Sequence, residues 1–272
     1  MVWWDEEKAL WVGHDIPDFT ASKGPHYRPP AGATRGEALS GIDPFVMQAD
    51  GKGWLFAPAG LVDGPLPTHY EPQESPTANP LYKQQRSPVR QIFNHEHNRY
   101  HPSGGEPGAE VYPHVVTTFR LTEHFTAGGM SRWVSKLSEL QPEMFCEVSP
   151  ELAEDCGLEH QGWATIITAR NCIEARVLVT PRMTPLHVDG KVVHQIALPF
   201  HWGSNGYTSG DAANDLTSIV LDPNVHIQEV KALTAAIRPG RRPTGPQRAE
   251  LVREYQRRAG ITEDTGTEVL SV

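Results

Sequence analysis

The stretch VVTTFRLTEHFTAGGMSR at residues 115–132 carries more recognisable chemistry than any other stretch of similar length. As far as Phe125, apolar and polar side chains alternate as they do along a half-buried β-strand. One face is predicted to hold Val115, Phe119, Leu121 and Phe125, and the other Thr118, Arg120, Thr122 and His124. The pattern therefore predicts a strand that packs on one side and is free to bind a polar group on the other.

A turn with few side chains, TAGG at residues 126–129, follows this predicted strand. Its glycines can bring backbone N–H groups against a ligand, and Ser131 is placed to cap a short helix. Together with the guanidinium of Arg120 and the imidazole of His124, such groups suit a phosphate-bearing, hydroxyl-rich ligand. The same residues are also typical of an ordinary half-exposed antiparallel sheet, so both interpretations stay open at this point.

Composition limits the class of protein. The 272 residues include 24 Gly and 24 Pro, with 38% hydrophobic and 21% charged residues. These values are typical of a soluble globular protein with many turns and short strands, and they argue against a helical bundle. The net charge is −9 and no run of Lys and Arg interleaved with aromatic residues is present, so nucleic acid is not an expected partner.

Cysteine and histidine patterns indicate neither a disulfide scaffold nor a metal site. Cys146, Cys156 and Cys172 form no CxxC pair and are expected to be free thiols in a reducing setting. The segment NHEHNRYH at residues 94–101 has three histidines, but Arg99 stands where a zinc-protease HExxH motif needs its second histidine. We interpret this segment as a polar surface loop and predict no metal ligand in the chain.

No targeting or membrane-spanning segment is expected. No apolar run approaches the roughly 18 residues that span a bilayer, and the acidic start MVWWDEEKALW is unlike a signal peptide. The sequence leaves the localisation open: cytoplasmic, or exported through a partner polypeptide.

Three parts are predicted along the chain. Residues 1–112 form a long irregular arm anchored on scattered aromatic side chains, with a hairpin turn at Asp50-Gly51. Residues 113–240 hold six short strands and small helices, which point to a small closed barrel. Residues 241–272 form a helix over residues 244–259 and a mobile acidic tail.

Within the barrel region, local signals predict individual elements. Trp133, Leu137 and Leu140 are expected on one side of a short helix. Ser149-Pro150-Glu151 is a strong helix start and Gly157 the matching stop. The predicted strands cover residues 143–148, 163–170, 173–180, 191–200 and 230–237, with Asn171-Cys172 and Asn205-Gly206 as turns. His187, His194 and His226 are expected to be surface or hydrogen-bonded histidines, and Trp163 a core residue.

Several segments together resemble the C-terminal part of the catalytic alpha subunit of molybdenum- or tungsten-dependent formate dehydrogenases, in the DMSO reductase family. The similar segments are TTFRLTEHFTAGGMSR, LPFHWGSNGYTSGDAANDLT, DPNVHIQEVKALTAAIRP, WVGHDIPDF, GKGWLFAPAGLVDGPLP and HYEPQESPTANPLY. The resemblance covers residues 1–240. It implies a six-stranded double-psi β-barrel, of the aspartate-decarboxylase-like kind, that binds a molybdopterin guanine dinucleotide.

The resemblance also implies positions for the cofactor contacts. Arg120 matches an arginine that lies against the phosphate and pterin region, and His124 and Thr126 match polar residues that contact the same ligand. The complete set of candidate cofactor-binding residues is Arg120, Thr122, His124, Thr126, Trp202, Gly203, Asn214 and Lys231. Leu121 departs from the pattern, because some relatives carry an acid directly after the arginine.

The motifs expected of a complete enzyme are missing. The chain has no cluster-binding cysteine motif, no cysteine or selenocysteine placed to ligate the metal, and no His/Arg pair for formate. We therefore predict no catalytic residue and an isolated chain without activity. Two-electron oxidation of formate to carbon dioxide would need an N-terminal catalytic, iron–sulfur part as partner, and possibly an iron–sulfur electron-transfer subunit.

Two other hypotheses remain open. The chain could be a stand-alone molybdopterin carrier or assembly module that takes no part in turnover. It could also be the equivalent domain of a molybdoenzyme that reduces nitrate or a sulfur oxide, although the formate-type segments before residue 113 weigh against this. Neither molybdenum nor tungsten is favoured by the sequence.

Overall fold

A computed structural model of the chain describes residues 2–13, 62, 71–72, 74–81, 91–92, 108–222, 224–228, 230 and 232–261. Two compact units are present, residues 1–68 and residues 69–272, and each is considered by itself. The hairpin expected at Asp50-Gly51, the histidine-rich segment at 94–101 and the acidic tail lie outside the described residues.

The first unit contains a β-hairpin, β1 (Val2–Asp5) and β2 (Leu10–Gly13), where the sequence predicts only an irregular arm. Trp4 and Trp11 pack edge to face with ring centroids 5.6 Å apart, and Trp11 is buried. Aromatic side chains across an antiparallel pair stabilise it, and this pairing explains the ordered strands. Residues 2–13 of the predicted arm thus contain a hairpin that the sequence pattern does not indicate.

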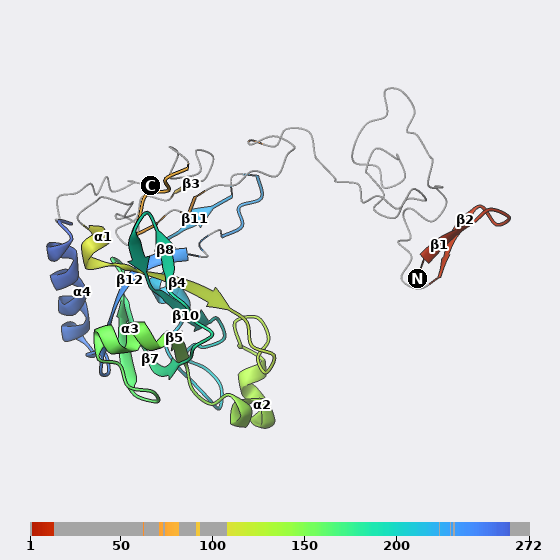
Figure 1. Cartoon of the computed structure of the whole chain (residues 1–272). Helices are drawn as coiled ribbons and strands as arrows, with labels where there is room; N and C mark the ends of the chain where they lie inside the picture. The colour runs from red at the N-terminus through yellow and green to blue at the C-terminus, as the bar shows by residue number, and fades with distance from the viewer. Residues whose placement is uncertain are drawn as a thin grey trace, which may run out of the picture. The chain divides into compact units, whose positions relative to one another are not determined.

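The second unit is built around a closed six-stranded barrel with the order β10-β4-β12-β6-β7-β5 (Figure 1). Pairs β4–β10 and β5–β7 are parallel, and the other four pairs are antiparallel. The barrel confirms the predicted fold class, a mainly β double-psi barrel with small helices. Its strands are β4 (His114–Phe119), β5 (Phe145–Val148), β6 (Trp163–Ile167), β7 (Cys172–Val179), β10 (Gln195–Pro199) and β12 (Ala232–Pro239).

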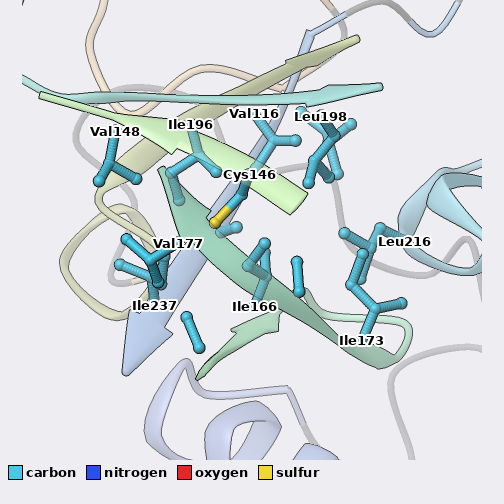
Figure 2. Packing of buried hydrophobic residues seen from close by; sticks show 14 of the residues in the cluster. Val116, Cys146, Val148, Ile166, Ile173, Val177, Ile196, Leu198, Leu216 and Ile237 are labelled. Carbon is cyan, nitrogen blue, oxygen red and sulfur yellow. The ribbon is translucent and has the colours of Figure 1, made fainter. Parts of the chain in front are cut away.

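Apolar side chains from every strand fill the barrel. Figure 2 shows Val116, Cys146, Ile166 and Ile196 turned into the space that the strands enclose, and all four are fully buried. Burial raises the pKa of the Cys146 thiol to about 12, so this cysteine is a core residue that stays protonated. All three cysteines are free thiols.

The strand at the centre of the predicted pattern is shorter than expected and packs through the opposite face. It ends at Phe119, not Phe125, and Val116 is its fully buried residue while Val115 is only half-buried. Beyond Phe119 the chain leaves the sheet, so the alternation that the sequence shows no longer sets which side chains are buried.

Local helix signals are confirmed at α3 (Pro150–Cys156). The Ser149 hydroxyl accepts a hydrogen bond from the Leu152 amide (3.1 Å), and Gly157 ends the helix in the left-handed region (φ +65°). The C-terminal helix α4 (Pro246–Arg258) is also confirmed and buries Leu251 and Val252 against a second apolar cluster with α1 (Gly108–Val111). It lies along one side of the barrel in Figure 1.

Residues before the barrel belong to the same unit. A Glu74 carboxylate oxygen accepts hydrogen bonds from the amide (2.8 Å) and hydroxyl (3.0 Å) of Thr234 on β12, and the other forms a buried ion pair with Arg170 (2.5 Å). In addition, β3 (Gln91–Ile92) pairs with β11 (Val220–Leu221). The domain limits 1–112, 113–240 and 241–272 stay predictions, but Glu74 bonds barrel residues and β3 pairs with β11.

Other elements differ from the sequence-based expectations. The single strand expected over residues 191–200 is two strands, because β9 (Lys191–Val193) pairs with β8 (Leu186–Val188) while β10 pairs with β4 and β5. Trp163 is half-buried, not a core residue, since the guanidinium groups of Arg176 and Arg241 lie over its ring at 4.2 and 4.5 Å.

The segment after residue 130 folds as a 3-10 turn, η3 (Ser131–Trp133), followed by α2 (Ser135–Leu140). Ser131 does not cap a helix, and Trp133 and Leu140 are exposed instead of forming a packed face; Ser138 is the buried residue of α2. Among the described residues, no helix has the length and apolarity needed to cross a membrane.

Candidate functional site

The candidate site lies where two parallel strands end side by side. In the β4–β10 register Phe119 is opposite Pro199, and the Phe200 amide donates to the Phe119 carbonyl (3.1 Å). Because parallel strands end at the same edge of a barrel, the connection after β4 (residues 120–133) and the connection after β10 (residues 200–210) meet there. We call these two connections the loop cluster.

His201 joins the two connections. Its Nε2 accepts a hydrogen bond from the Leu121 amide (2.7 Å), so the ring proton is on Nδ1, which donates to the Thr126 carbonyl (2.6 Å). The side chain is fully buried. Burial, and then the positive charges of Arg120 and Arg132, lower the pKa of His201 and outweigh the opposing hydrogen bond to Thr126.

Arg132 joins the same connections through its guanidinium. It donates to the backbone carbonyls of Ala127 (2.8 Å), Asn205 (2.7 Å) and His201, and it is almost fully buried. Gly128 must be a glycine here, because it has φ +74° and a Cβ atom would lie 2.0 Å from the His201 carbonyl oxygen. In the Gly-Gly turn, the close approach at Gly128 is therefore to the His201 carbonyl of the same chain.

His124 lies inside the loop cluster, although the strand pattern places it on the free polar face. It is 4% exposed, with Nδ1 3.1 Å from the Ser131 hydroxyl and Nε2 3.1 Å from the Gln141 carbonyl. Its ring packs edge to face on Trp202 (centroids 5.2 Å apart). Trp202 is also buried, and its indole N–H has no hydrogen-bond partner among the described residues.

Other groups of the loop cluster face outward. Arg120 is exposed, with its guanidinium 4.4 Å from the centre of the Phe200 ring, and no carboxylate pairs with it in the described part of the chain. Thr122 and Thr126 are exposed, and a Cβ atom on Gly129 would meet nothing within 4 Å. A free guanidinium, two hydroxyls and open backbone together can bind an anionic, hydrogen-bonding ligand.

The remaining predicted residues are less closely joined to the loop cluster. Gly203 belongs to it, next to the Arg132 guanidinium. Asn214 is exposed on η4 (Ala213–Leu216), which packs against β7, and no hydrogen bond of its side chain to the cluster is present among the described residues. Lys231 lies outside the described residues.

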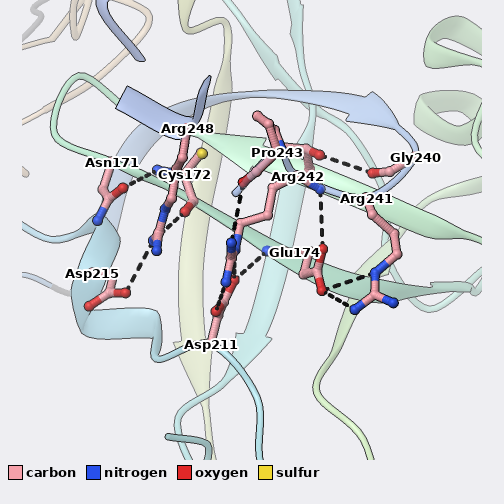
Figure 3. Close-up of polar contacts among 11 residues, drawn as sticks. Asn171, Cys172, Glu174, Asp211, Asp215, Gly240, Arg241, Arg242, Pro243 and Arg248 are labelled. Atoms are coloured by element: carbon pink, nitrogen blue, oxygen red, sulfur yellow. Dashed lines mark hydrogen bonds and ion pairs between the residues drawn. The ribbon is translucent and has the colours of Figure 1, made fainter. Parts of the chain in front are cut away.

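A network of charged residues links η4 to β7 and α4, as Figure 3 shows. Arg242 forms two hydrogen bonds with the Asp211 carboxylate (2.5 and 2.7 Å), and Arg248 bonds the Cys172 carbonyl (2.7 Å) and Asp215 (3.3 Å). These contacts attach the segment that carries Asn214 to β7 and to the start of α4.

Sequence reasoning missed His201, Arg132 and Phe200 as parts of the site. The signal available was the run Phe200-His201-Trp202-Gly203, of which only the last two residues were singled out. No group of three or more His, Cys, Asp or Glu side chains suited to a metal ion occurs in the described ranges.

Comparisons with known proteins bear on the same region. Residues 115–234 match the model of the molydopterin dinucleotide binding domain. The chain is 38% identical over 240 residues to formate dehydrogenase 2 subunit alpha (cytochrome c-553) of Nitratidesulfovibrio vulgaris, covering 86% of this chain and 21% of that protein.

Two further relatives agree. The formate dehydrogenase-O major subunit of Escherichia coli K12 is 36% identical, with 84% of this chain and 20% of the relative covered. The formate dehydrogenase subunit alpha of Megalodesulfovibrio gigas is 36% identical, with 85% and 21% covered. The chain thus spans about a fifth of the length of these relatives. By these matches, residues 115–234 belong to the molybdopterin dinucleotide binding domain family, and the chain is similar over most of its length to part of the alpha subunits of formate dehydrogenases.

Proposed function

We propose that this chain is the cofactor-binding C-terminal part of a formate dehydrogenase catalytic subunit, and that its loop cluster binds molybdopterin guanine dinucleotide. The observation that carries the proposal is Arg120, an exposed guanidinium without a carboxylate partner among the described residues, at the edge where β4 and β10 end. An unpaired arginine in this setting suits a diphosphate, which it can bind through two parallel hydrogen bonds.

The other outward-facing groups fit the same ligand. The hydroxyls of Thr122 and Thr126 can bond phosphate or pterin edges, and the unpartnered Trp202 N–H can donate if the surrounding loops shift slightly. Gly203, Asn214 and Lys231 complete the proposed set by resemblance. When bound, the cofactor supplies the molybdenum or tungsten centre that accepts two electrons, while this chain binds and orients it.

Formate oxidation is proposed only for the assembled enzyme. The chain spans about a fifth of the length of its relatives. By the resemblance, the iron–sulfur and metal-ligating residues belong to an N-terminal part of the catalytic subunit. The loop cluster and the adjoining α2 expose large apolar side chains, which would favour burial against such a partner. They are Phe125, Met130, Trp133, Val134, Leu140 and Tyr207.

The cofactor proposal is tested by purifying the chain from a host that makes molybdopterin guanine dinucleotide and measuring the guanosine monophosphate that acid releases per protein. Arg120→Ala should retain at least about tenfold less dinucleotide, because a charge-assisted hydrogen-bond pair is lost. Arg176→Ala is the matched control, since Arg176 is bound to Glu143 (2.7 Å) and lies over Trp163.

Equal retention in the two variants would remove Arg120 from the site, and no dinucleotide in the parent chain would contradict the cofactor proposal. The assembly proposal is tested separately, with formate and an artificial electron acceptor. The chain alone should be inactive, and adding the remaining alpha-subunit polypeptide of its host should give formate-dependent reduction. If dinucleotide is bound but the mixture stays inactive, the chain is a carrier module instead.

A further inference from the structure

One buried side chain connects the two halves of the proposed site. Leu121 and Thr126 both lie in the connection after β4, and both bond the ring of His201, which lies 80 and 75 residues further along the chain. His201 uses both ring nitrogens and has no exposed surface. It cannot therefore contact a ligand directly, but it sets where the outward-facing groups Arg120, Thr122 and Thr126 lie.

Thr126 needs to be held in place. It has φ +52°, in the left-handed region that is unfavourable for a residue with a Cβ atom. Such a conformation persists only when surrounding contacts impose it. The contact at this residue is the short hydrogen bond from His201 Nδ1 to the Thr126 carbonyl.

The protonation state of His201 decides whether both bonds can exist. Neutral His201 accepts from Leu121 at Nε2, whereas a protonated ring has no acceptor and would face the Leu121 N–H with its own N–H. The charged groups around the ring also oppose protonation. Arg120 follows β4, His124 lies in the same connection, and Arg132 lies in η3.

We propose that His201 is a positioning residue: in its neutral form, with the proton on Nδ1, it holds the connection after β4 in the conformation that binds the dinucleotide. Protonation breaks the Leu121 bond, relaxes Thr126 and releases the ligand. The closed form, in which His201 makes both hydrogen bonds, takes up a proton at His201 less readily than the open form, in which they are broken. Acidification through the ordinary range of histidine, near pH 6.5, therefore favours the open loop.

This inference rests on the proposed dinucleotide binding, and its test uses the full chain with molybdopterin guanine dinucleotide as the probe. Retention of the dinucleotide is measured after dialysis at about pH 7.5 and about pH 5.5, which bracket the ordinary histidine pKa. The parent chain should lose several-fold more at the lower pH, up to about tenfold, which equals about 1.4 kcal/mol.

Three variants distinguish positioning from a general effect on folding. His201→Gln keeps an acceptor but does not titrate, so it should retain dinucleotide at both pH values more evenly than the parent. His201→Ala removes both bonds and should bind at least about tenfold less at either pH. His187→Gln, an exposed residue of β8, is the matched control and should behave as the parent.

A second measurement does not depend on the ligand. In the parent chain the protection factor of the Leu121 amide against hydrogen exchange should fall on acidification, and in His201→Gln it should change little. Dinucleotide bound by the parent with the same pH dependence in His201→Gln would overturn the inference and leave the proposed function intact. A parent chain that binds no dinucleotide but shows pH-dependent protection of the Leu121 amide would overturn the proposed function. It would leave the pH-dependent hydrogen bonding of His201 standing.

Discussion

Within the barrel unit, arginines in two places differ in whether a carboxylate pairs with them. On the side of β7 and α4, Arg242 and Arg241 pair with Asp211 and Glu174 through charge-assisted hydrogen bonds (Figure 3). At the edge where β4 and β10 end, Arg120 lies over the Phe200 ring and pairs with no carboxylate among the described residues. The net charge of −9 means that carboxylates are plentiful, so an arginine without one is informative.

On the proposed function, the difference is between arginines that stabilise the fold and an arginine that is available to a ligand. A paired arginine lowers the energy of the fold and has little left to offer an anion. An unpaired arginine contributes little to stability and can bind a diphosphate. Removing a paired arginine should therefore lower the free energy of unfolding, whereas removing Arg120 should lower dinucleotide retention. The three substitutions below run from the largest to the smallest expected effect on stability.

Arg170→Met is expected to be the most damaging of these changes. Arg170 forms a buried ion pair with Glu74 and also bonds the Leu216 carbonyl (2.8 Å), so its loss leaves a buried carboxylate without its cation. The free energy of unfolding, measured by urea titration, should fall by about 3–5 kcal/mol. The double variant Glu74→Gln/Arg170→Met should recover part of the loss. A loss under about 0.5 kcal/mol would show that this pair does not hold Glu74 to the barrel.

Arg242→Ala should have an intermediate effect, about 1–3 kcal/mol, because its hydrogen bonds to Asp211 are charge-assisted and mostly buried. Burial alone would raise the pKa of Asp211, but the hydrogen bonds and charge of Arg242 outweigh it and lower that pKa. The contribution is thus present above the ordinary aspartate pKa of 3.8 and disappears as the pH falls through the lower folded-state value.

Urea titrations of the parent and Arg242→Ala at neutral and acidic pH measure this dependence. The stability difference between them should shrink on acidification below pH 3.8. A difference that stays constant over this range would mean that Arg242 acts through packing and not through the Asp211 carboxylate.

Arg120→Ala should change stability least. Its side chain is exposed and makes no ion pair in the described part of the chain, so the free energy of unfolding should stay within about 0.5 kcal/mol of the parent. The same urea titration measures this value on the protein used for dinucleotide retention. A destabilisation as large as that of Arg242→Ala would erase the contrast between the two groups.

Much of the fold is predictable because it depends on local signals. Ser149 and Gly157 mark the ends of α3 whatever surrounds them, and short β-rich runs between turns are sufficient to indicate a six-stranded barrel. The division of residues 191–200 into β9 and β10 is different. It reflects a change of partner strand, and hydrophobic periodicity carries no information about partners.

For the candidate site, the sequence suggests residues but not their geometry. The sequence and its resemblance bring Arg120, Thr122 and Thr126 to attention, and they are exposed in the loop cluster. The alternation that places His124 outward fails because the strand ends at Phe119 and the following chain folds back over Trp202. The importance of His201 arises only from contacts with residues about 80 positions away, which no local pattern can reveal.

The parallel pairing of β4 with β10 also has a consequence for biosynthesis. A ribosome that has released residues 1–180 has already made Arg120, yet β10 and His201 do not exist, and the edge that would hold the loop has no second strand. Contacts between distant parts of a chain form slowly, since a long loop must close first. The edge that we propose to bind an anion therefore cannot form before β10 has been made. On this proposal, the chain gains affinity for the cofactor only after that point.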